Sequence, residues 1–457
     1  MDTSPAGREP GFFDRFNDWR KNSLALKLAT VGILILLMMI PLGMIESLIW
    51  ERSSRKNEAE SEVASTWGGR QEICGPVLTI PYIARHVSEV HYDQNGNPIT
   101  QAKPEIRYAH FLPKTLSITS VVDPMIRNRG IYEVLVYNAD IHLEGSFVKP
   151  DFTGWPEVEE VLWSSAFVSI GVTDMRAIRD QITLAWNDTS LAMEPGVQGS
   201  DVLYSGVSTR TPAGINDTVD YRFSADLRVG GNSSLMFIPL GEETSASVLS
   251  TWASPKFTGA FLPDPRPEVG KDGFSASWKV LHLNRNYPQR FLGSAEGFSE
   301  SAFGVELLIM VDQYQRNERS AKYGMMLITL VFLLFFFTQA LNGVRIHFVQ
   351  YLLVGFSLSM FYLLLLSFSE HIGFNKSYAL GALSTAVLVT LYFKAITRSW
   401  KLSSMLLFLL FFIFTFIFVI IQMEDFALLV GSVGLFVVLA TVMYLSRKVD
   451  WYALGRR

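Results

Sequence analysis

The sequence predicts a mixed α and β membrane protein, with six transmembrane helices and a large β-rich, sandwich-like domain inserted between helices 1 and 2. One apolar stretch lies near the start, at 24–45, and a dense block of apolar runs fills 323–445. Roughly 270 residues of polar, strand-like sequence separate them. Only 18% of the 457 residues are charged, against about 25% in soluble proteins. The shortfall is concentrated in the C-terminal third.

Six apolar runs approach the ~20 residues that a helix needs to cross a bilayer. The first is long and is followed by Glu46, Glu51 and Arg52 without a small-residue cleavage pattern, which favours an uncleaved signal anchor over a cleaved signal peptide. The predicted spans are 24–45, 323–341, 348–368, 377–397, 402–421 and 426–445.

Lysine and arginine in the short flanks predict the orientation of the spans. Basic residues gather before the first span, between the second and third, between the fourth and fifth, and after the sixth. We therefore expect cytoplasmic tails at 1–23 and 446–457, and a periplasmic segment at 46–322. In the first tail, Phe12, Phe13, Phe16 and Trp19 share a helical face, so this tail is either an interfacial helix or a frayed basic end.

The segment 46–322 begins as a stalk and continues as strands. The pairs Glu51/Arg55 and Lys56/Glu60 have i,i+4 spacing, which predicts a helix leading out of the membrane. Beyond it, apolar residues alternate with polar ones, as in Tyr221–Val229, and Gly230-Gly231-Asn232 is interpreted as a turn. This pattern predicts antiparallel strands in a β-sandwich or in two stacked β-lobes.

Composition and motifs point away from catalysis and from nucleic acid. The net charge is -4, which leaves no basic footprint for nucleic acid. No HExxH, GxSxG, CxxC or Walker A pattern occurs, so no catalytic, cofactor-binding or metal-binding residue is assigned and no cofactor is expected. Cys74, the one cysteine, is interpreted as a small core residue. An enzyme is not excluded but is the less favoured class.

Two polar groups remain as candidate sites. Arg127 and Arg129 precede a strong strand. They could form an anion-binding turn, but we favour an ordinary charged turn. The second group is predicted to couple the outer segment to the membrane helices, or else only to solvate the interface. In it we expect Arg319 or Lys322 to pair with Glu370, and His371 to be partly buried and to titrate near neutral pH. Its members are Asp312, Arg319, Lys322, Glu370 and His371.

Several long segments resemble the CreD family of bacterial inner-membrane proteins, in the expected order and over nearly the whole chain. Gln339 stands where the family has an acidic residue and Phe348 where it has proline, so no family role is assigned to either. The segments are WGGRQEICGPVLTIPY at 67–82, RNRGIYEVLVYNADIHLEGSF at 127–147, FTGAFLPDPRP at 257–267, MVDQYQRNERSAKYG at 310–324, IHFVQYLLVGFSLSMFYLLLLSFSEHIGF at 346–374, and SYALGAL at 377–383.

The resemblance implies a context rather than a reaction. CreD-like proteins are associated with the CreB/CreC two-component system, with envelope integrity and with responses to β-lactams and colicins. We therefore expect a non-enzymatic protein of envelope stress or maintenance in the bacterial inner membrane, acting through its periplasmic domain. Its partners would be the lipid bilayer and, as an open possibility, other envelope proteins; the oligomeric state stays open. Alternatives are a transporter or flippase-like carrier, which the lack of charges in the centres of the last five spans disfavours, and a periplasmic hydrolase.

The orientation leads to a first prediction. A reporter that is active only in the periplasm is expected to be active when fused at Gly199 and inactive when fused after Arg457, because the basic flanks keep both termini in the cytoplasm. Enzymatic activity of the two fusions in intact cells measures this. An active fusion after Arg457, or an inactive one at Gly199, would reverse the topology.

Overall fold

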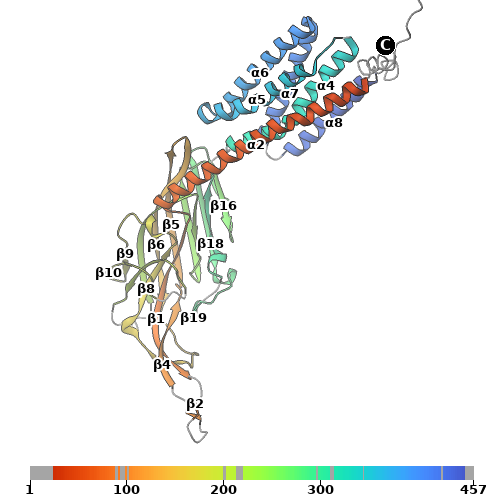
Figure 1. Ribbon diagram of the computed structural model, residues 1–457. Coiled ribbons are helices and arrows are strands. Elements are labelled where there is room, and N and C mark those ends of the chain that lie inside the picture. The colour runs from red at the N-terminus through yellow and green to blue at the C-terminus, as the bar shows by residue number, and fades with distance from the viewer. Residues whose placement is uncertain are drawn as a thin grey trace, which may run out of the picture. The chain divides into compact units, whose positions relative to one another are not determined.

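The computed structural model describes residues 24–87, 91–92, 98–99, 102–198, 202–212, 220–294, 297–308, 313–342, 344–423 and 426–447. The predicted N-terminal tail 1–23 and most of the tail 446–457 lie outside these residues. The chain forms two compact units, which are described separately (Figure 1). The membrane unit comprises Met1–Arg55 and Val311–Arg457, and the β unit comprises Lys56–Met310.

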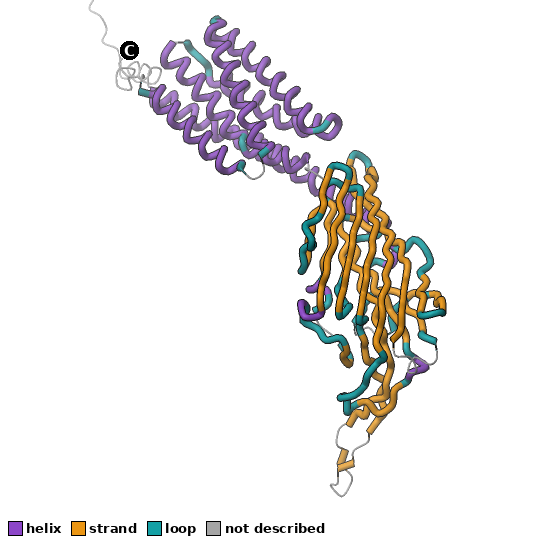
Figure 2. Tube along the Cα trace, turned by 180° about the vertical axis from the view of Figure 1, so that it is seen from behind, coloured by secondary structure: helices purple, strands orange, loops and turns teal. Residues whose placement is uncertain are grey.

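The membrane unit is built from helices (Figure 2). The first five predicted spans are confirmed as helices that are long and apolar enough to cross a membrane. The sixth falls on helix α8, whose apolar run, Leu429–Thr441, is shorter. The helices are α2 (Leu24–Trp67), α3 (Gln313–Lys322), α4 (Gly324–Asn342), α5 (Phe348–Ile372), α6 (Phe374–Thr397), α7 (Trp400–Gln422) and α8 (Ala427–Ser446).

The first half of α2 packs into the bundle at two glycines. A Cβ on Gly324 would lie 2.8 Å from Leu42, and one on Gly355 would lie 2.5 Å from the sulfur of Met38. Small residues at helix contacts let membrane helices approach closely, since lipid supplies no hydrophobic drive for association. The short polar helix α3, which the sequence analysis placed in the outer segment, packs with α4 and α5 in this unit.

The β unit contains two large sheets. The 10-stranded sheet has the path β11 (Glu194–Pro195), β12 (Gly206–Arg210), β8 (Phe167–Val172), β1 (Gln71–Val87), β14 (Ser234–Phe237), β20 (Phe303–Leu307) and β16 (Pro255–Gly259), with β4 (Ala102–Phe111) and β7 (Val158–Val161) on β1 and β19 (Arg290–Leu292) on β4. The 8-stranded sheet has the order β10 (Thr189–Ala192), β9 (Thr183–Trp186), β13 (Asp220–Asn232), β6 (Tyr132–Val148), β5 (Thr115–Arg129), β15 (Glu243–Ser250), β18 (Gly273–Leu281) and β17 (Glu268–Gly270). The short strands β2 (His91–Tyr92) and β3 (Pro98–Ile99) pair with each other.

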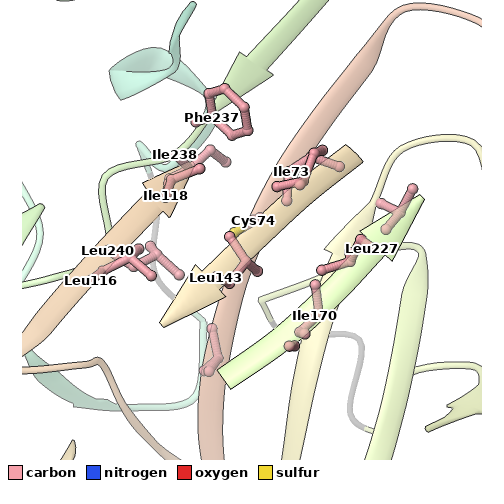
Figure 3. Packing of buried hydrophobic residues seen from close by; sticks show 14 of the residues in the cluster. Ile73, Cys74, Leu116, Ile118, Leu143, Ile170, Leu227, Phe237, Ile238 and Leu240 are labelled. Carbon is pink, nitrogen blue, oxygen red and sulfur yellow. The ribbon is translucent and has the colours of Figure 1, made fainter. Parts of the chain in front are cut away.

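The two sheets share one hydrophobic core, which confirms a large two-sheet β region (Figure 3). Ile73 and Ile170 come from the larger sheet, and Ile118 and Leu143 from the smaller. The period-two pattern predicted this correctly, because alternate residues of β13 are buried from Tyr221 to Val229. Successive side chains of a strand point to opposite faces, so alternation buries one face and exposes the other.

Two details of the β prediction are wrong. Not all strands are antiparallel, because β1 pairs with β14, and β5 with β15, in parallel. Gly230-Gly231-Asn232 is not a turn but the end of β13, and the chain turns instead at Ser233, with φ of 61°. Glycine is needed inside the strand because a Cβ on Gly231 would lie 2.3 Å from the hydroxyl of Tyr137.

Cys74 lies in β1 and is 5% exposed. Burial raises the pKa of its thiol, and the carboxylate of Glu72 adds a smaller effect in the same direction. The thiolate, which is the reactive form, is therefore suppressed. Cys74 is placed as an inert core residue.

We therefore predict that Cys74→Ala folds normally and lowers the free energy of unfolding by only about 1 kcal/mol, because one small buried group is removed. Maleimide labelling of the native wild-type protein should be slow, and labelling in denaturant should be complete. The Cys74→Ala protein controls for labelling elsewhere. Fast, complete labelling of the native protein would contradict the inert assignment.

Candidate functional site

Helix α2 carries two polar contact sites, one in each unit. The first, called the Glu370 cluster, joins Arg52 of α2 to Tyr314 of α3 and Glu370 of α5 in the membrane unit. The second, called the Trp67 joint, fixes the last turn of α2 to strands of the β unit. Each is described within its own unit.

The Glu370 cluster surrounds a carboxylate that is almost buried. The Glu370 side chain is only 10% exposed, and its Oε1 lies 3.9 Å from Nε of Arg52. The Tyr314 hydroxyl donates a hydrogen bond of 3.1 Å to the same oxygen. A buried charge is tolerated when it is paired and hydrogen-bonded, and Arg52 and Tyr314 provide both kinds of partner to the Glu370 side chain.

A second layer of polar groups lies beside this carboxylate. Asn317, 1% exposed, donates hydrogen bonds of 2.9 Å to the Ser369 hydroxyl and to the Gln313 carbonyl. Among the described residues, Oδ1 of Asn317 and the hydroxyl of Ser320 are buried without a hydrogen-bond partner. Such atoms are uncommon in native interiors and each calls for an explanation.

The structure rearranges the predicted coupling group. Glu370 is present, but its cation is Arg52, whereas Lys322 pairs with Glu318 at 2.8 Å. Within the described part of the chain, no ion pair joins Glu370 to Arg319 or Lys322. His371 was expected to be partly buried, and it is exposed in the last turn of α5. Asp312 lies outside the described residues.

Sequence reasoning missed Arg52, Asn317 and Ser369 as members of the cluster. A signal for Asn317 was present, because Tyr314, Asn317 and Ser320 recur at spacing three and therefore share a face of α3. No comparable signal exists for Arg52. It meets Glu370 only through tertiary packing, and the two residues are far apart in the sequence.

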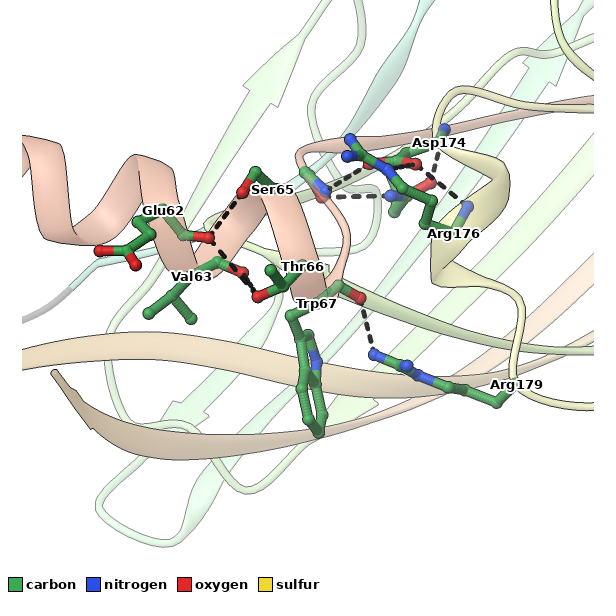
Figure 4. Close-up of polar contacts among 10 residues, drawn as sticks. Glu62, Val63, Ser65, Thr66, Trp67, Asp174, Arg176 and Arg179 are labelled. Atoms are coloured by element: carbon green, nitrogen blue, oxygen red, sulfur yellow. Dashed lines mark hydrogen bonds and ion pairs between the residues drawn. The ribbon is translucent and has the colours of Figure 1, made fainter.

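The Trp67 joint places an indole between two guanidinium groups. The Arg179 and Arg127 Cζ atoms lie 4.3 Å and 4.7 Å from the ring centroid. The indole nitrogen donates to the Tyr137 carbonyl at 3.1 Å. Arg179 donates to the Trp67 carbonyl at 2.6 Å (Figure 4). Cation–π contacts are each worth about 0.5–1 kcal/mol at exposed sites, so the last turn of α2 is fixed by several modest contacts at once.

The two glycines that follow Trp67 let the chain leave the helix while its backbone lies close to neighbouring residues. Gly68 has φ of 126°, and a Cβ there would lie 2.8 Å from that of Ala177. The Gly69 amide donates to the Asp174 carboxylate at 3.2 Å. Hydrogen bonds from Arg176, with smaller contributions from the Gly69 amide, hold the pKa of Asp174 below its ordinary value. The Asp174 carboxylate therefore stays ionised and keeps its hydrogen bond to the Gly69 amide, which holds the chain in place after the helix.

Arg127 and Arg129 are both engaged with α2. Arg127 covers the Trp67 ring, and Nε of Arg129 donates to the Glu62 carboxylate at 3.0 Å. Both arginines lie at the end of strand β5, next to the turn at Gly130, rather than in the turn itself. Their contacts speak against an anion-binding turn, because the guanidinium groups already face an aromatic ring and a carboxylate of the same chain.

The described residues offer little for catalysis or for metal binding. They hold no group of three or more His, Cys, Asp or Glu side chains that could bind a metal ion. The His142 imidazole contacts Asp226 at 2.7 Å, but its Nε2 faces the Glu144 carboxylate at 3.8 Å rather than a hydroxyl. A serine nucleophile needs its hydroxyl at that nitrogen, so this pair does not form a hydrolase triad.

Comparisons with known proteins agree with the apolar helices of the membrane unit. The family described as Inner membrane protein CreD matches residues 23–452. The chain is also 32% identical over 440 residues to Inner membrane protein CreD of Escherichia coli (strain K12), with 95% of each protein covered. Together with the apolar helices, these matches indicate a multi-pass protein of the inner membrane. The match over nearly the full length shows that this chain belongs to the CreD family of inner membrane proteins.

Proposed function

We propose that this protein serves the envelope-stress or envelope-maintenance response without catalysing a reaction, and that helix α2 relays the state of its β unit to its membrane helices. In this proposal the β unit is periplasmic, as the basic flanks of the spans favour. This response is the one that the family resemblance implies, together with an association with the CreB/CreC two-component system.

The observation that carries the proposal is that α2 is held by polar contacts at two places along one unbroken helix. Arg52 contacts Glu370, and Trp67 is held by Arg127 and Arg179. The stretch between Arg52 and Trp67 is helical throughout and spans about 22 Å at 1.5 Å per residue. A continuous helix can transmit displacement or rotation along its axis, which a flexible tether cannot.

The Glu370 cluster supplies an element that such a signal could rearrange. Its unpartnered atoms, Oδ1 of Asn317 and the hydroxyl of Ser320, would gain hydrogen bonds from a shift that brings a donor or acceptor to them. Coupling requires an element with two arrangements of similar free energy. A polar layer with unsatisfied atoms meets this requirement better than a fully apolar contact.

The relay is tested at Asn57, an exposed residue of α2 between the two sites. Asn57→Pro removes a helical hydrogen bond and kinks the helix, at a cost of about 3 kcal/mol or more. Asn57→Ala, the matched control, strengthens the helix. We expect the proline variant to lose complementation of a deletion strain under β-lactam stress, and the alanine variant to retain it.

Abundance and folding are measured in the same membranes. The proline variant should accumulate normally and keep Cys74 protected from maleimide, which shows that the β unit has folded. Full complementation by Asn57→Pro would contradict the relay, because a kinked α2 would then serve as well as a straight one.

A second test exchanges the charges of the Glu370 cluster. Glu370→Lys places an ammonium group against Arg52 in a nearly buried site. We expect it to destabilise the purified full chain by about 2 kcal/mol or more and to impair complementation. Adding Arg52→Glu should restore both in part, because it recreates an ion pair with the opposite polarity.

Glu318→Lys is the matched control, since Glu318 pairs with Lys322 at an exposed position of α3. Exposed ion pairs contribute about 0–1 kcal/mol, so this control should leave the thermal transition and complementation nearly unchanged. If Glu370→Lys is as silent as Glu318→Lys, the cluster is ordinary interfacial polarity.

A further inference from the structure

A groove in the membrane unit lies between two adjacent apolar helices, α6 and α7. It has a volume of about 630 Å³. Small residues of α6 form one wall and aromatic rings of α7 form the other, which leaves an open apolar groove along the helices. The walls include Ala379, Ala382 and Ala386, and Phe408, Phe411 and Phe418.

One end of the groove is polar. Asn375 lines it, and its Oδ1 accepts hydrogen bonds from the Gln422 amide at 2.8 Å and from Arg316 at 3.5 Å. The Arg316 guanidinium also lies 5.7 Å from the ring centroid of Phe374. Among the described residues, no carboxylate lies within ion-pair distance of Arg316; residues 424–425 are not among them.

We propose that this groove binds a phospholipid, with an acyl chain between α6 and α7 and the phosphate at Arg316. The groove runs along α6 from Asn375 to Ala386, about 16 Å at 1.5 Å per residue. This matches one leaflet, since half of the ~30 Å hydrocarbon core is about 15 Å. Arginine presents several N–H donors in a planar fork that suits phosphate oxygens.

Charge complementarity selects a lipid over a helix from a second copy of the chain. An apolar helix could fill the channel between the alanines and the phenylalanines. It would bring no anion to the Arg316 guanidinium, which has no carboxylate within ion-pair distance among the described residues, whereas a phospholipid supplies both the chain and the charge. This inference does not depend on the proposed relay through α2.

The test is native mass spectrometry of the full chain in detergent, titrated with dioleoylphosphatidylglycerol. Dioleoylglycerol, which has the same chains and no phosphate, is the matched ligand. We expect Arg316→Gln to weaken binding of the phospholipid about tenfold, because a charged hydrogen bond is lost, and to leave binding of dioleoylglycerol unchanged. Ala382→Phe, which fills the channel, should weaken binding of both ligands.

Two control variants keep the result interpretable. Leu380→Phe enlarges an exposed residue of α6 outside the groove wall, and Lys322→Gln removes an exposed charge of α3 that pairs with Glu318. Both should bind the phospholipid like the parent protein. An unchanged thermal transition in each variant shows that the bundle is intact.

The proposal is overturned if Ala382→Phe binds the phospholipid as well as Leu380→Phe does. It is also overturned if Ala382→Phe changes the oligomeric state without changing lipid binding, because the groove would then be an interface between copies. Equal loss of both ligands in Arg316→Gln would show that Arg316 does not recognise the phosphate.

Discussion

The contacts of Trp67 with Arg127 and Arg179 fix the last turn of α2, just before the first strand of the larger sheet. The contact draws on distant parts of the chain, because Arg127 comes from β5, Arg179 follows a short 3-10 helix, and the accepting carbonyl of Tyr137 belongs to β6. Immediately after this joint the chain becomes β1, which pairs with β4, β7, β8 and β14. The end of α2 is therefore anchored directly before the central strand of the larger sheet.

Helix α2 changes from apolar to charged along its length, as suits a helix that leaves a lipid environment for water. Its first half packs Met38 and Leu42 against the glycines of α4 and α5, where close approach is the main source of attraction. Its second half is charged, with exposed i,i+4 pairs such as Glu51–Arg55. Arg52 lies where the sequence changes character, so its guanidinium can remain partly solvated while it neutralises the nearly buried Glu370.

Local periodicity was sufficient to predict the elements, and it was insufficient for contacts between distant segments. Alternation in β13 and the apolar runs of α4–α7 follow from side-chain geometry within one segment, and the sequence contains that information directly. Position 231 requires glycine because the Tyr137 ring occupies the space of a Cβ there, and Glu370 meets Arg52 because α2 packs on α5. Both facts require the fold to be known. The parallel pairing of β5 with β15 is likewise a matter of topology, on which alternation carries no information.

The polar layer between α3 and α5 is costly if stability is its only purpose. A buried group without a hydrogen-bond partner costs about 1–3 kcal/mol, and Asn317 and Ser320 each bury one such atom within the described structure. Apolar residues of similar volume would pack at the same contact without this cost. A rearrangement of α3 against α5 can gain hydrogen bonds at these atoms. Among the described residues of the bundle, the hydroxyls of Ser357, Tyr362 and Thr390 are also buried without a partner. Under the proposed relay, the α3–α5 contact is therefore a place where a shift of α2 can be answered by new hydrogen bonds.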